Sequence, residues 1–317
     1  MDSTTARIGN LILSSPISQA LEILGDRWSF LTLRDLFLGR HRFGEFVTST
    51  GASRSTLANR LNTLQAHGLV YKTLYHENPP RYEYRLSEKG LALYNFALAI
   101  WAWETRWSGN PTSVMPIQLY HEPCANHFLP KPICSHCGSE VHIKAVSTRP
   151  GSSLPDDTLA KSSRTRRSRM ASDKAQNRED SMLETSELLA DRWTPLVLAA
   201  TLYGLRRYDD IRNELSIATN ILADRLERLV AHRMLSREQY QDNPPRYEYR
   251  LTEKARDYFI IAIALHQWSE QWLNSPGLGA TIMSHSCCDA PIRVDMCCDH
   301  CMEAVKPHDV SYSHFSQ

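Results

Sequence analysis

Hydrophobic residues recur at every third or fourth position in five stretches between residues 16 and 107, a spacing that places them on one face of an α-helix. The fourth stretch begins at Ser53, whose hydroxyl can cap a helix, and its buried face consists of Leu57, Leu61 and Leu64. A short turn of small residues, 50–52, separates it from the third stretch. Two helices joined in this way predict a helix-turn-helix.

The pattern changes after Gly68, where residues 69–75 and 81–86 are predicted to be extended. Pro79 and Pro80 cannot donate to a strand ladder, so they are expected at the tip of a hairpin. A last helix is predicted from Ser87 to about Trp107. It is apolar around almost its whole circumference, so we expect it to pack against a second partner as well as its own core.

The whole pattern occurs twice. The nonapeptide that begins at Asn78 and ends at Leu86 is repeated without change from Asn243 to Leu251, 165 positions later. The same shift aligns the Asp-Arg-Trp sequence at residues 26–28 with that at 191–193. The chain therefore contains one domain written twice. The fold class predicted for it is mainly α with small β (α+β), each copy having a two-stranded wing and a long C-terminal helix.

These patterns divide the chain into six parts. They are a flexible N-terminus (1–15), winged-helix domain 1 (16–108), a Cys/His tail (109–144), a flexible basic linker (145–180), winged-helix domain 2 (181–273) and a second Cys/His tail (274–317).

Composition limits the function classes. The net charge of the 317 residues is only +1, so nucleic-acid binding would need positive charge gathered on one face. No apolar run approaches the roughly 20 residues of a membrane span, and the N-terminus lacks the order of a secretory signal. We therefore expect a cytoplasmic protein without a membrane partner, whose eight cysteines are thiols or metal ligands rather than disulfides.

Taken together, the Asp-Arg-Trp motif, the segment from Leu57 to Leu61, residues 67–70 and the Pro-Pro-Arg-Tyr-Glu-Tyr-Arg-Leu motif resemble the HxlR-type winged-helix regulators of bacteria. The resemblance covers about two thirds of the chain. It implies a transcriptional regulator that binds double-stranded DNA sequence-specifically, usually as a homodimer of single-domain chains. Because two copies are fused here, we expect an internal pseudo-dimer, with a homodimer of the whole chain as the alternative. A small-molecule effector could act by changing the packing of the two long helices, but no residue identifies one.

The second helix of each helix-turn-helix is expected to enter the major groove. In the first copy the residues expected at the DNA are Arg54, Ser55, Thr56 and Asn59 for bases and Arg60 for phosphates. In the second copy they are Thr219, Asn220 and Arg225, with Asp224 in the place of Asn59. The outer faces of these two helices differ, so the two half-sites of the DNA operator should differ in sequence. The alternative is that the second copy has lost base readout, since Asp224 is unfavourable near phosphate.

The wing arginines, Arg81 and Arg246, lie beside the proline tips, where they can enter a minor groove or contact phosphates. The alternative is an ion pair with Glu83 or Glu248 across the hairpin. The basic linker is a further source of phosphate affinity, or a solvated connection without a role beyond its reach.

A second repeated pattern lies in the tails. Its residues are His121, Cys124, Cys134 and Cys137 in the first tail and His285, Cys288, Cys298 and Cys301 in the second, with identical separations. Pairs of ligands three positions apart are typical of tetrahedral zinc sites, so we expect one structural Zn²⁺ in each tail and no other cofactor. Cytosolic thiols without metal are the alternative. His127, His136 and His300 could replace the assigned histidines, and Cys287 and Cys297, which have no counterpart in the first tail, are candidates for free reactive thiols.

No catalytic motif is present, neither a Gly-rich phosphate loop, a metalloprotease helix nor a nucleophile elbow, so we do not expect an enzyme. Two functions remain as alternatives to the regulator on a two-half-site operator. One is a winged-helix protein-interaction module with zinc-held docking tails. The other is a regulator that responds to thiol oxidation or to metal, although no cysteine precedes Cys124, where sensors of the family carry theirs.

Overall fold

The structure is a computed structural model and describes residues 5–107, 117–150, 183–188, 191–273 and 281–314. The winged helix-turn-helix order predicted from the sequence is confirmed in both repeats. The first repeat consists of α2 (Pro16–Leu24), α3 (Arg27–Phe37), α4 (Phe43–Thr50), α5 (Arg54–Ala66), β1 (Val70–His76), β2 (Arg81–Leu86), α6 (Glu88–Leu91) and α7 (Tyr94–Trp107). The second consists of α9 (Leu183–Leu188), α10 (Trp193–Leu202), α11 (Tyr208–Leu215), α12 (Thr219–Ala231), β7 (Leu235–Gln241), β8 (Arg246–Leu251) and α13 (Glu253–Trp272).

Local sequence explains where α5 begins and which face it buries. This helix is the second helix of the first helix-turn-helix, called the recognition helix below, and α12 is its equivalent in the second repeat. The Ser53 hydroxyl accepts a hydrogen bond from the backbone N–H of Thr56, as a helix cap should. Leu57, Leu61 and Leu64 are each 0% exposed, so the predicted buried face is confirmed. In the second repeat Leu222 and Leu229 are also 0% exposed and Leu226 is 2% exposed.

The two long helices lie side by side in the centre of the molecule. The indole N–H of Trp103 on α7 donates to the carbonyl of Lys254, 2.9 Å away, at the start of α13. The indole N–H of Trp268 on α13 donates to the carbonyl of Lys89 over the same distance. These two bonds join equivalent positions of the two repeats, and the second packing partner expected for the apolar helix is therefore its counterpart in the other repeat.

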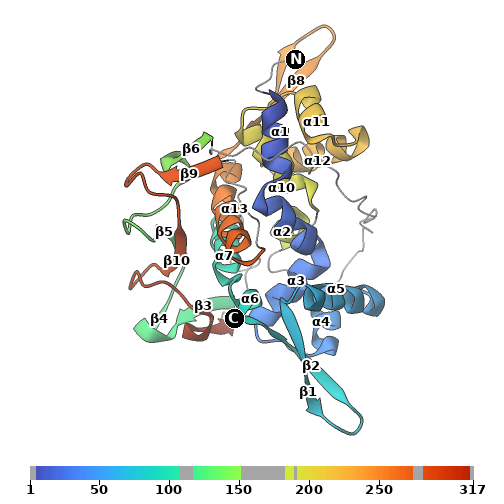
Figure 1. The fold of residues 1–317 in the computed structure, drawn as a ribbon, viewed down its shortest axis with the longest axis vertical. Coiled ribbons are helices and arrows are strands. Elements are labelled where there is room, and N and C mark those ends of the chain that lie inside the picture. The colour runs from blue at the N-terminus through green and yellow to red at the C-terminus, as the bar shows by residue number, and fades with distance from the viewer. Residues whose placement is uncertain (1–4, 108–116, 151–182, 189–190, 274–280, 315–317) are drawn as a thin grey trace.

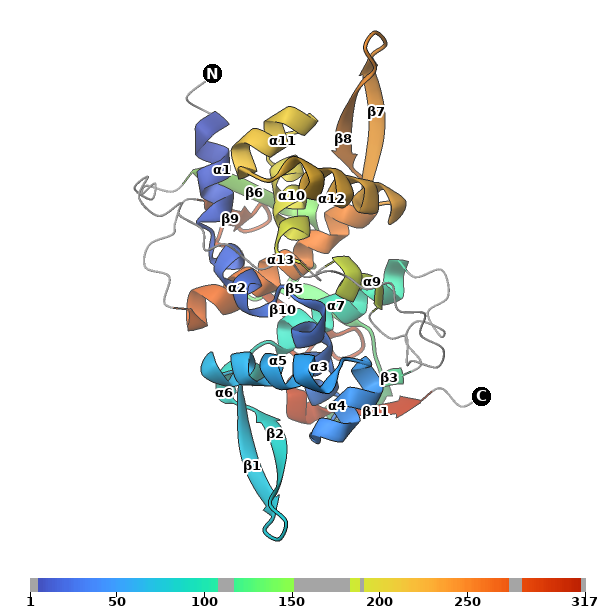
Figure 2. The same ribbon diagram turned by 90° about the vertical axis from the view of Figure 1, so that its right-hand side faces the viewer.

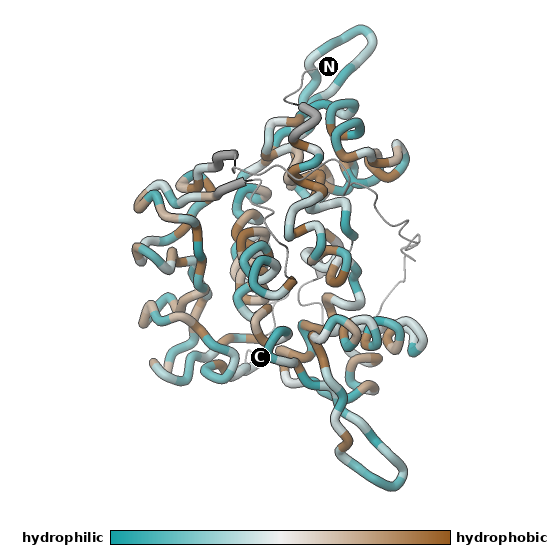
Figure 3. Tube along the Cα trace, viewed as in Figure 1, coloured by the Kyte–Doolittle hydropathy of each residue, from teal (hydrophilic) through white to brown (hydrophobic). Residues whose placement is uncertain are grey.

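The elements form three layers (Figure 1). The tails lie on one side, α7 and α13 lie in the middle, and the helix-turn-helix elements lie on the other side. Hydrophobic stretches gather along the central helices, whereas the two wings are largely hydrophilic (Figure 3). None of the helices in the described part of the chain is long and apolar enough to cross a membrane.

The tails contain short strands that pair with each other. The elements of the first tail are β3 (Ile117–His121), η1 (Glu122–Cys124), β4 (Asn126–His127), β5 (Pro130–Cys134), η2 (Ile143–Ala145) and β6 (Val146–Pro150). Those of the second are β9 (Thr281–His285), β10 (Val294–Cys298), η4 (Pro307–Asp309) and β11 (Val310–His314). Strand β3 pairs with β11, β5 with β10 and β6 with β9, all antiparallel, so every one of these three ladders joins one tail to the other.

Three expectations need correction. Part of the terminus expected to be flexible is ordered, because α1 (Thr5–Leu13) packs on α10 and α11 of the second repeat. A Cβ at Gly9 would lie 2.1 Å from the carbonyl oxygen of Glu214, so the close approach requires glycine.

The second correction concerns the boundary of the first tail. Residues 145–150 belong to the first tail rather than to the linker, because β6 is paired with β9. The rest of the basic linker lies outside the described residues.

The third correction concerns the last helix of the first repeat, which is divided into α6 and α7. Ser87 caps α6 as expected, accepting from the backbone N–H of Gly90. In the second repeat, by contrast, the equivalent α13 is one continuous helix of 20 residues.

Candidate nucleic-acid interface and candidate metal centres

The recognition helices α5 and α12 lie on the same face of the molecule, and the two wings extend from opposite ends of that face (Figure 2). Each wing is the predicted hairpin, in which Val70 pairs with Leu86 and Leu235 pairs with Leu251. The prolines form the tips of both hairpins, which point away from each other at the two ends of the face that carries α5 and α12 (Figure 2).

The outer face of α5 carries the first set of expected contacts. Arg54, Ser55 and Asn59 are exposed, and Thr56 is half-buried. The Arg54 guanidinium lies over the ring of Phe43, 5.2 Å from its centroid, so the base of this side chain is supported while its charge remains accessible.

Arg60 and Arg225 are placed differently from their neighbours. Arg60 Nε lies 3.1 Å from the carboxylate of Asp26, which also caps α3. Arg225 Nε lies 2.8 Å from Asp191, the equivalent aspartate, which caps α10. Both arginines are therefore anchored within their own lobes, with 34% of the Arg60 side chain and 17% of the Arg225 side chain exposed.

The outer face of α12 is less positive than that of α5. Thr219 and Asn220 are exposed, and the carbonyl of Thr219 accepts a hydrogen bond of 2.7 Å from the Tyr208 hydroxyl. Asp224 pairs with Arg225 and, at 3.0 Å, with Arg228 one turn later. The aspartate charge is thus compensated within the helix, which weakens the argument that it must repel a phosphate backbone.

The wing arginines are exposed in both repeats. The glutamates that were the alternative partners are bound instead to Arg85 and Arg250, since Arg85 Nη2 lies 2.8 Å from Glu83 and Arg250 Nη2 lies 2.5 Å from Glu248. Within the described part of the chain, no acidic side chain pairs with Arg81 or Arg246.

The eight expected metal ligands form two groups of four, but the groups cross between the tails. The first consists of His121, Cys124, Cys298 and Cys301, and the second of Cys134, Cys137, His285 and Cys288. Within each group the ligand atoms lie within 4.8 Å of one another. The expectation of one site within each tail is wrong, because β5 pairs with β10 and carries each half-site to its partner in the other tail.

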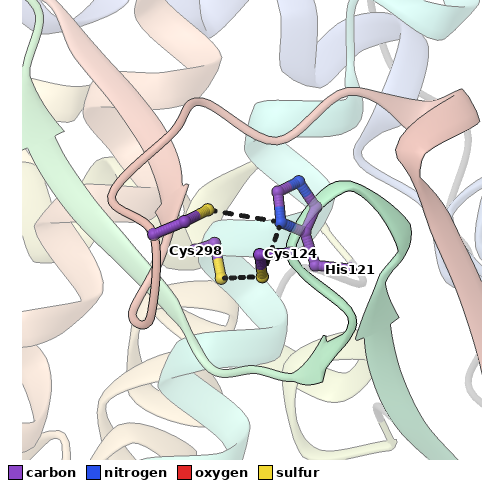
Figure 4. Close-up of side chains that lie close together, drawn as sticks. His121, Cys124 and Cys298 are labelled. Carbon is purple, nitrogen blue, oxygen red and sulfur yellow. Dashed lines mark hydrogen bonds between the residues drawn. The ribbon is translucent and has the colours of Figure 1, made fainter.

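Three members of the first group point toward one another (Figure 4). His121 Nδ1 lies 3.3 Å from Cys124 Sγ, which lies 3.7 Å from Cys298 Sγ. Burial opposes ionisation of Cys124, but hydrogen bonds from His121 and Cys298 outweigh it and lower the pKa of this thiol to about 7. In the second group, hydrogen bonds from the backbone and side chain of Ser139 are the largest effects that lower the pKa of Cys137 to about 6. These two thiols ionise more readily than a free cysteine. Burial, by contrast, raises the pKa of Cys298 in the first group to about 11.

The remaining cysteines and histidines of the tails lie outside these groups. His127, His136 and His300 belong to neither group of four. Cys287 is exposed, in agreement with its assignment as a free thiol. Cys297, however, is buried, and burial raises the pKa of its thiol to about 11, so it does not fit the expectation of a reactive cysteine.

Two features of the site were missed by sequence reasoning. The pairing of Asp26 with Arg60 had a usable signal, because both residues are unchanged in the second repeat while exposed neighbours such as Arg54 and Asn59 differ. The crossing of the metal ligands had no signal, since the two tails carry the same spacing and either grouping satisfies it.

A cavity of about 240 Å³ lies between the repeats. It is lined mainly by apolar side chains of α1, α2, α10 and α13, including Leu21, Leu198 and Tyr258. Its position at the contact between the lobes makes it a place where an apolar effector could bind, although no group in it selects a particular compound.

The HxlR-like helix-turn-helix family matches the chain twice, at residues 23–111 and 188–276. The chain belongs to this family. The match includes both recognition helices and both wings, so the resemblance inferred from the motifs is confirmed. The family and its relatives are transcriptional regulators, not enzymes.

Two relatives are named as uncharacterized HTH-type transcriptional regulators. The HTH-type transcriptional regulator Rv3095 of Mycobacterium tuberculosis (strain ATCC 25618 / H37Rv) is 38% identical over 135 residues, which cover 43% of this chain and 85% of the relative. The HTH-type transcriptional regulator sll1512 of Synechocystis is 36% identical over 93 residues, 29% of this chain and 69% of its own. The solved structure of PA1374 from Pseudomonas aeruginosa shares 29% identity over 35% of this chain and 76% of its own, with a TM-score of 0.28.

Proposed function

We propose that this HxlR-like protein regulates transcription by binding one operator of two unlike half-sites with both of its lobes, residues 16–108 and 181–273, as an internal pseudo-dimer. The observation that carries the proposal is the placement of α5 and α12 on one face with a wing at either end (Figure 2). A recognition helix fits a major groove, and two helices on one face can meet successive major grooves of one duplex.

The contact between the repeats supports the same arrangement. The equivalent indole hydrogen bonds of Trp103 and Trp268 give α7 and α13 matching roles, as in a dimer with two-fold symmetry. The 135 residues aligned with Rv3095 make up 85% of that protein, so it is about half as long as this chain. One tandem chain therefore corresponds to two chains of such a relative.

The charge distribution suggests which residues contact DNA. Arg54 on α5 and the unpaired arginines of the wings, Arg81 and Arg246, are free to contact DNA. Arg60 and Arg225 act mainly by fixing the recognition helix to the capped helix before it, because each is held by an aspartate. Ser55, Thr56, Asn59, Thr219 and Asn220 supply the polar contacts to base edges.

The test is a titration of duplex DNA from the upstream region of the gene, followed by fluorescence anisotropy, with the mass of the complex measured by sedimentation. We expect saturable binding that resists nonspecific competitor DNA, with one chain on each operator. Two chains per operator would replace the internal pseudo-dimer with a four-lobed assembly. Weak binding that disappears at physiological salt would instead favour the protein-interaction module.

The two wings allow a quantitative test of the proposed contact between their arginines and DNA phosphates. The double variant Arg81→Ala, Arg246→Ala should lower the slope of log K against log salt by about two, because each phosphate contact contributes about one. A matched control is Arg106→Ala, which removes an exposed arginine of α7 that pairs with Asp257. An unchanged slope in the wing variant would exclude both arginines from the interface.

A further inference from the structure

We propose that the chain holds two structural Zn²⁺ ions, each bound by one pair of ligands from either tail, so that the metal ties the two repeats together. The first site is the group of His121, Cys124, Cys298 and Cys301, and the second is the group of Cys134, Cys137, His285 and Cys288. Each site has three thiolates and one imidazole, a ligand set typical of structural zinc.

The backbone after each ligand pair has the same unusual conformation. Each pair is followed directly by a residue with positive φ, namely Ala125 (55°), Gly138 (71°), Asp289 (53°) and Met302 (62°). Three of these four are not glycine, and the left-handed conformation costs such residues free energy. The amides of Gly138 and Met302 donate to the carbonyls of Cys134 and Cys298, both at 2.9 Å, which closes the turn that brings two ligands to one point. The same turn in all four half-sites, strained in three of them, indicates a common ligand.

The distances between ligand atoms fit a tetrahedral ion. With Zn–S of about 2.3 Å and Zn–N of about 2.0 Å, a tetrahedron requires S···S of about 3.8 Å and S···N of about 3.5 Å. The first group has 3.7 Å from Cys124 Sγ to Cys298 Sγ and 3.4 Å from Cys301 Sγ to His121 Nδ1. In the second group His285 Nδ1 lies 3.3 Å from Cys137 Sγ and 3.9 Å from Cys288 Sγ. In both groups the histidine presents Nδ1 to the thiols.

Strand pairing explains why the ligands cross. Pro132 and Met296 occupy equivalent positions of the two tails, and they are partners in the ladder between β5 and β10. The two tails are therefore related by a local two-fold at this pair. The Cys-Cys half-site at the end of each strand meets the His-Cys half-site of the other tail. His121 and His285 are each 1% exposed, so both imidazoles are fixed within the tail layer.

The tail layer is also bonded to the central helices. The backbone N–H of Met296, in the second tail, donates to Asn95 on α7 of the first repeat at 3.2 Å. The backbone N–H of Val294 donates to Gln267 on α13 at 2.9 Å. A metal that fixes the tails to each other therefore also restrains α7 against α13. If the proposed function holds, this restraint sets the spacing of the recognition helices.

The first experiment is metal analysis of the purified full-length protein, without DNA, so that it succeeds or fails independently of the proposed function. We expect two zinc ions per chain. Reconstitution with Co²⁺ should likewise take up two equivalents and give the absorption of a tetrahedral thiolate site. A chain that neither retains zinc nor takes up Co²⁺ would overturn the proposal.

Two double variants distinguish crossed sites from sites within each tail. The variant Cys124→Ser, Cys298→Ser damages one crossed site and should retain one zinc per chain. The variant Cys124→Ser, Cys134→Ser damages both crossed sites and should retain none. Sites within each tail predict the reverse, which would refute the crossing. Cys287→Ser is the matched control, because this cysteine is exposed and belongs to neither group, so it should retain two.

Hydrogen exchange of the single variant Cys124→Ser is a second test of whether the ligands pair across the tails, and it does not depend on the stability of the double variants. Loss of the first site should speed amide exchange at residues 298–302, in the other tail, while residues 134–138 stay protected. Faster exchange at 134–138 with protection at 298–302 would show that the ligands pair within one tail and would overturn the proposal.

Discussion

The two repeats have the same helix-turn-helix framework, but they stabilise it by different means. Beneath α4, the first repeat buries a charged cluster in which Asp35, 0% exposed, lies 2.8 Å from Arg34 Nη2 and 3.0 Å from Arg40 Nη1. Ser49 completes the cluster by donating to the same carboxylate. The residues at the equivalent positions of the second repeat are Ala199, Ala200, Leu205 and Glu214.

The comparison shows that this framework does not depend on the buried charges. In the second repeat Ala200 and Leu205 are buried without ionic partners, in agreement with the small net benefit of buried ion pairs relative to apolar packing. Glu214, at the position of Ser49, has taken another role, since its carboxylate accepts from the backbone N–H of Gly9 and holds α1. The same position thus completes an internal cluster in the first lobe and binds the N-terminal helix α1 in the second.

The largest effect is expected when the carboxylate of the charged cluster is removed and its arginines are left in place. Asp35→Ala should lower the free energy of unfolding by about 3–5 kcal/mol, because it leaves the buried guanidinium of Arg34 without its carboxylate. Urea unfolding followed by circular dichroism measures the change. Asp209→Ala, an exposed carboxylate of the second repeat, should change the same quantity by less than about 0.5 kcal/mol.

The second repeat itself supplies the matched rescue. The triple variant Arg34→Ala, Asp35→Ala, Arg40→Leu installs the residues found at 199, 200 and 205 and should recover most of the stability lost in Asp35→Ala. A triple variant as unstable as the single one would mean that the two lobes are not interchangeable at this position, and that the cluster contributes more than charge compensation.

A smaller difference is expected between the outer faces of the recognition helices. Arg54→Ala should weaken operator binding by about 1–3 kcal/mol and relax specificity at one base pair of one half-site, as expected for an arginine that contacts a base. Thr219→Ala, at the equivalent position, should cost about 1 kcal/mol, the contribution of one neutral hydrogen bond. Anisotropy titrations on operators mutated in one half-site at a time assign each loss to its lobe.

Equal losses at Arg54 and Thr219 would remove the asymmetry between the half-sites. No loss for any substitution on α12, with the Arg54 effect intact, would mean that the second lobe supports the first without reading bases.

Sequence patterns predicted most of the winged-helix architecture because each lobe is built from local signals. Leucine spacing defined the buried face of α5, Ser53 and Asp26 gave the helix caps, and the proline pair located the wing tips. The apolar circumference of the last helix correctly predicted a second partner, which is the equivalent helix of the other repeat. In all of these cases the determining residues are close together in the chain.

What sequence could not predict depends on contacts between distant segments. The helix α1 has a short apolar stretch at residues 11–13, but its packing on α10 and α11 depends on Gly9 meeting Glu214, 205 positions away. The crossing of the tails is determined by the ladder between β5 and β10, and ligand spacing alone allowed both groupings. Because the two tails have the same ligand spacing, the sequence cannot show which tail supplies the second pair of ligands to each site. Each half-site has two chemically equal partners.

The smallest effect is expected at the residue that directly precedes the recognition helix. Ser53 caps α5 through its hydroxyl, whereas Ala218 precedes α12 without a side-chain cap. The backbone is the same at both positions, with φ −62° and ψ 148° at Ser53 and φ −65° and ψ 140° at Ala218. Ser53→Ala should therefore destabilise the protein by about 1 kcal/mol, and Ala218→Ser should stabilise it by up to the same amount.

Urea unfolding measures the change in the free energy of unfolding for the two single variants and for the exchange variant Ser53→Ala, Ala218→Ser. The exchange should return the stability close to that of the wild type, because the two caps lie in different lobes and their effects should add. If Ala218→Ser gave no gain, the uncapped start of α12 would be determined by its surroundings, such as the hydrogen bond from Tyr208 to the Thr219 carbonyl, rather than by the missing hydroxyl.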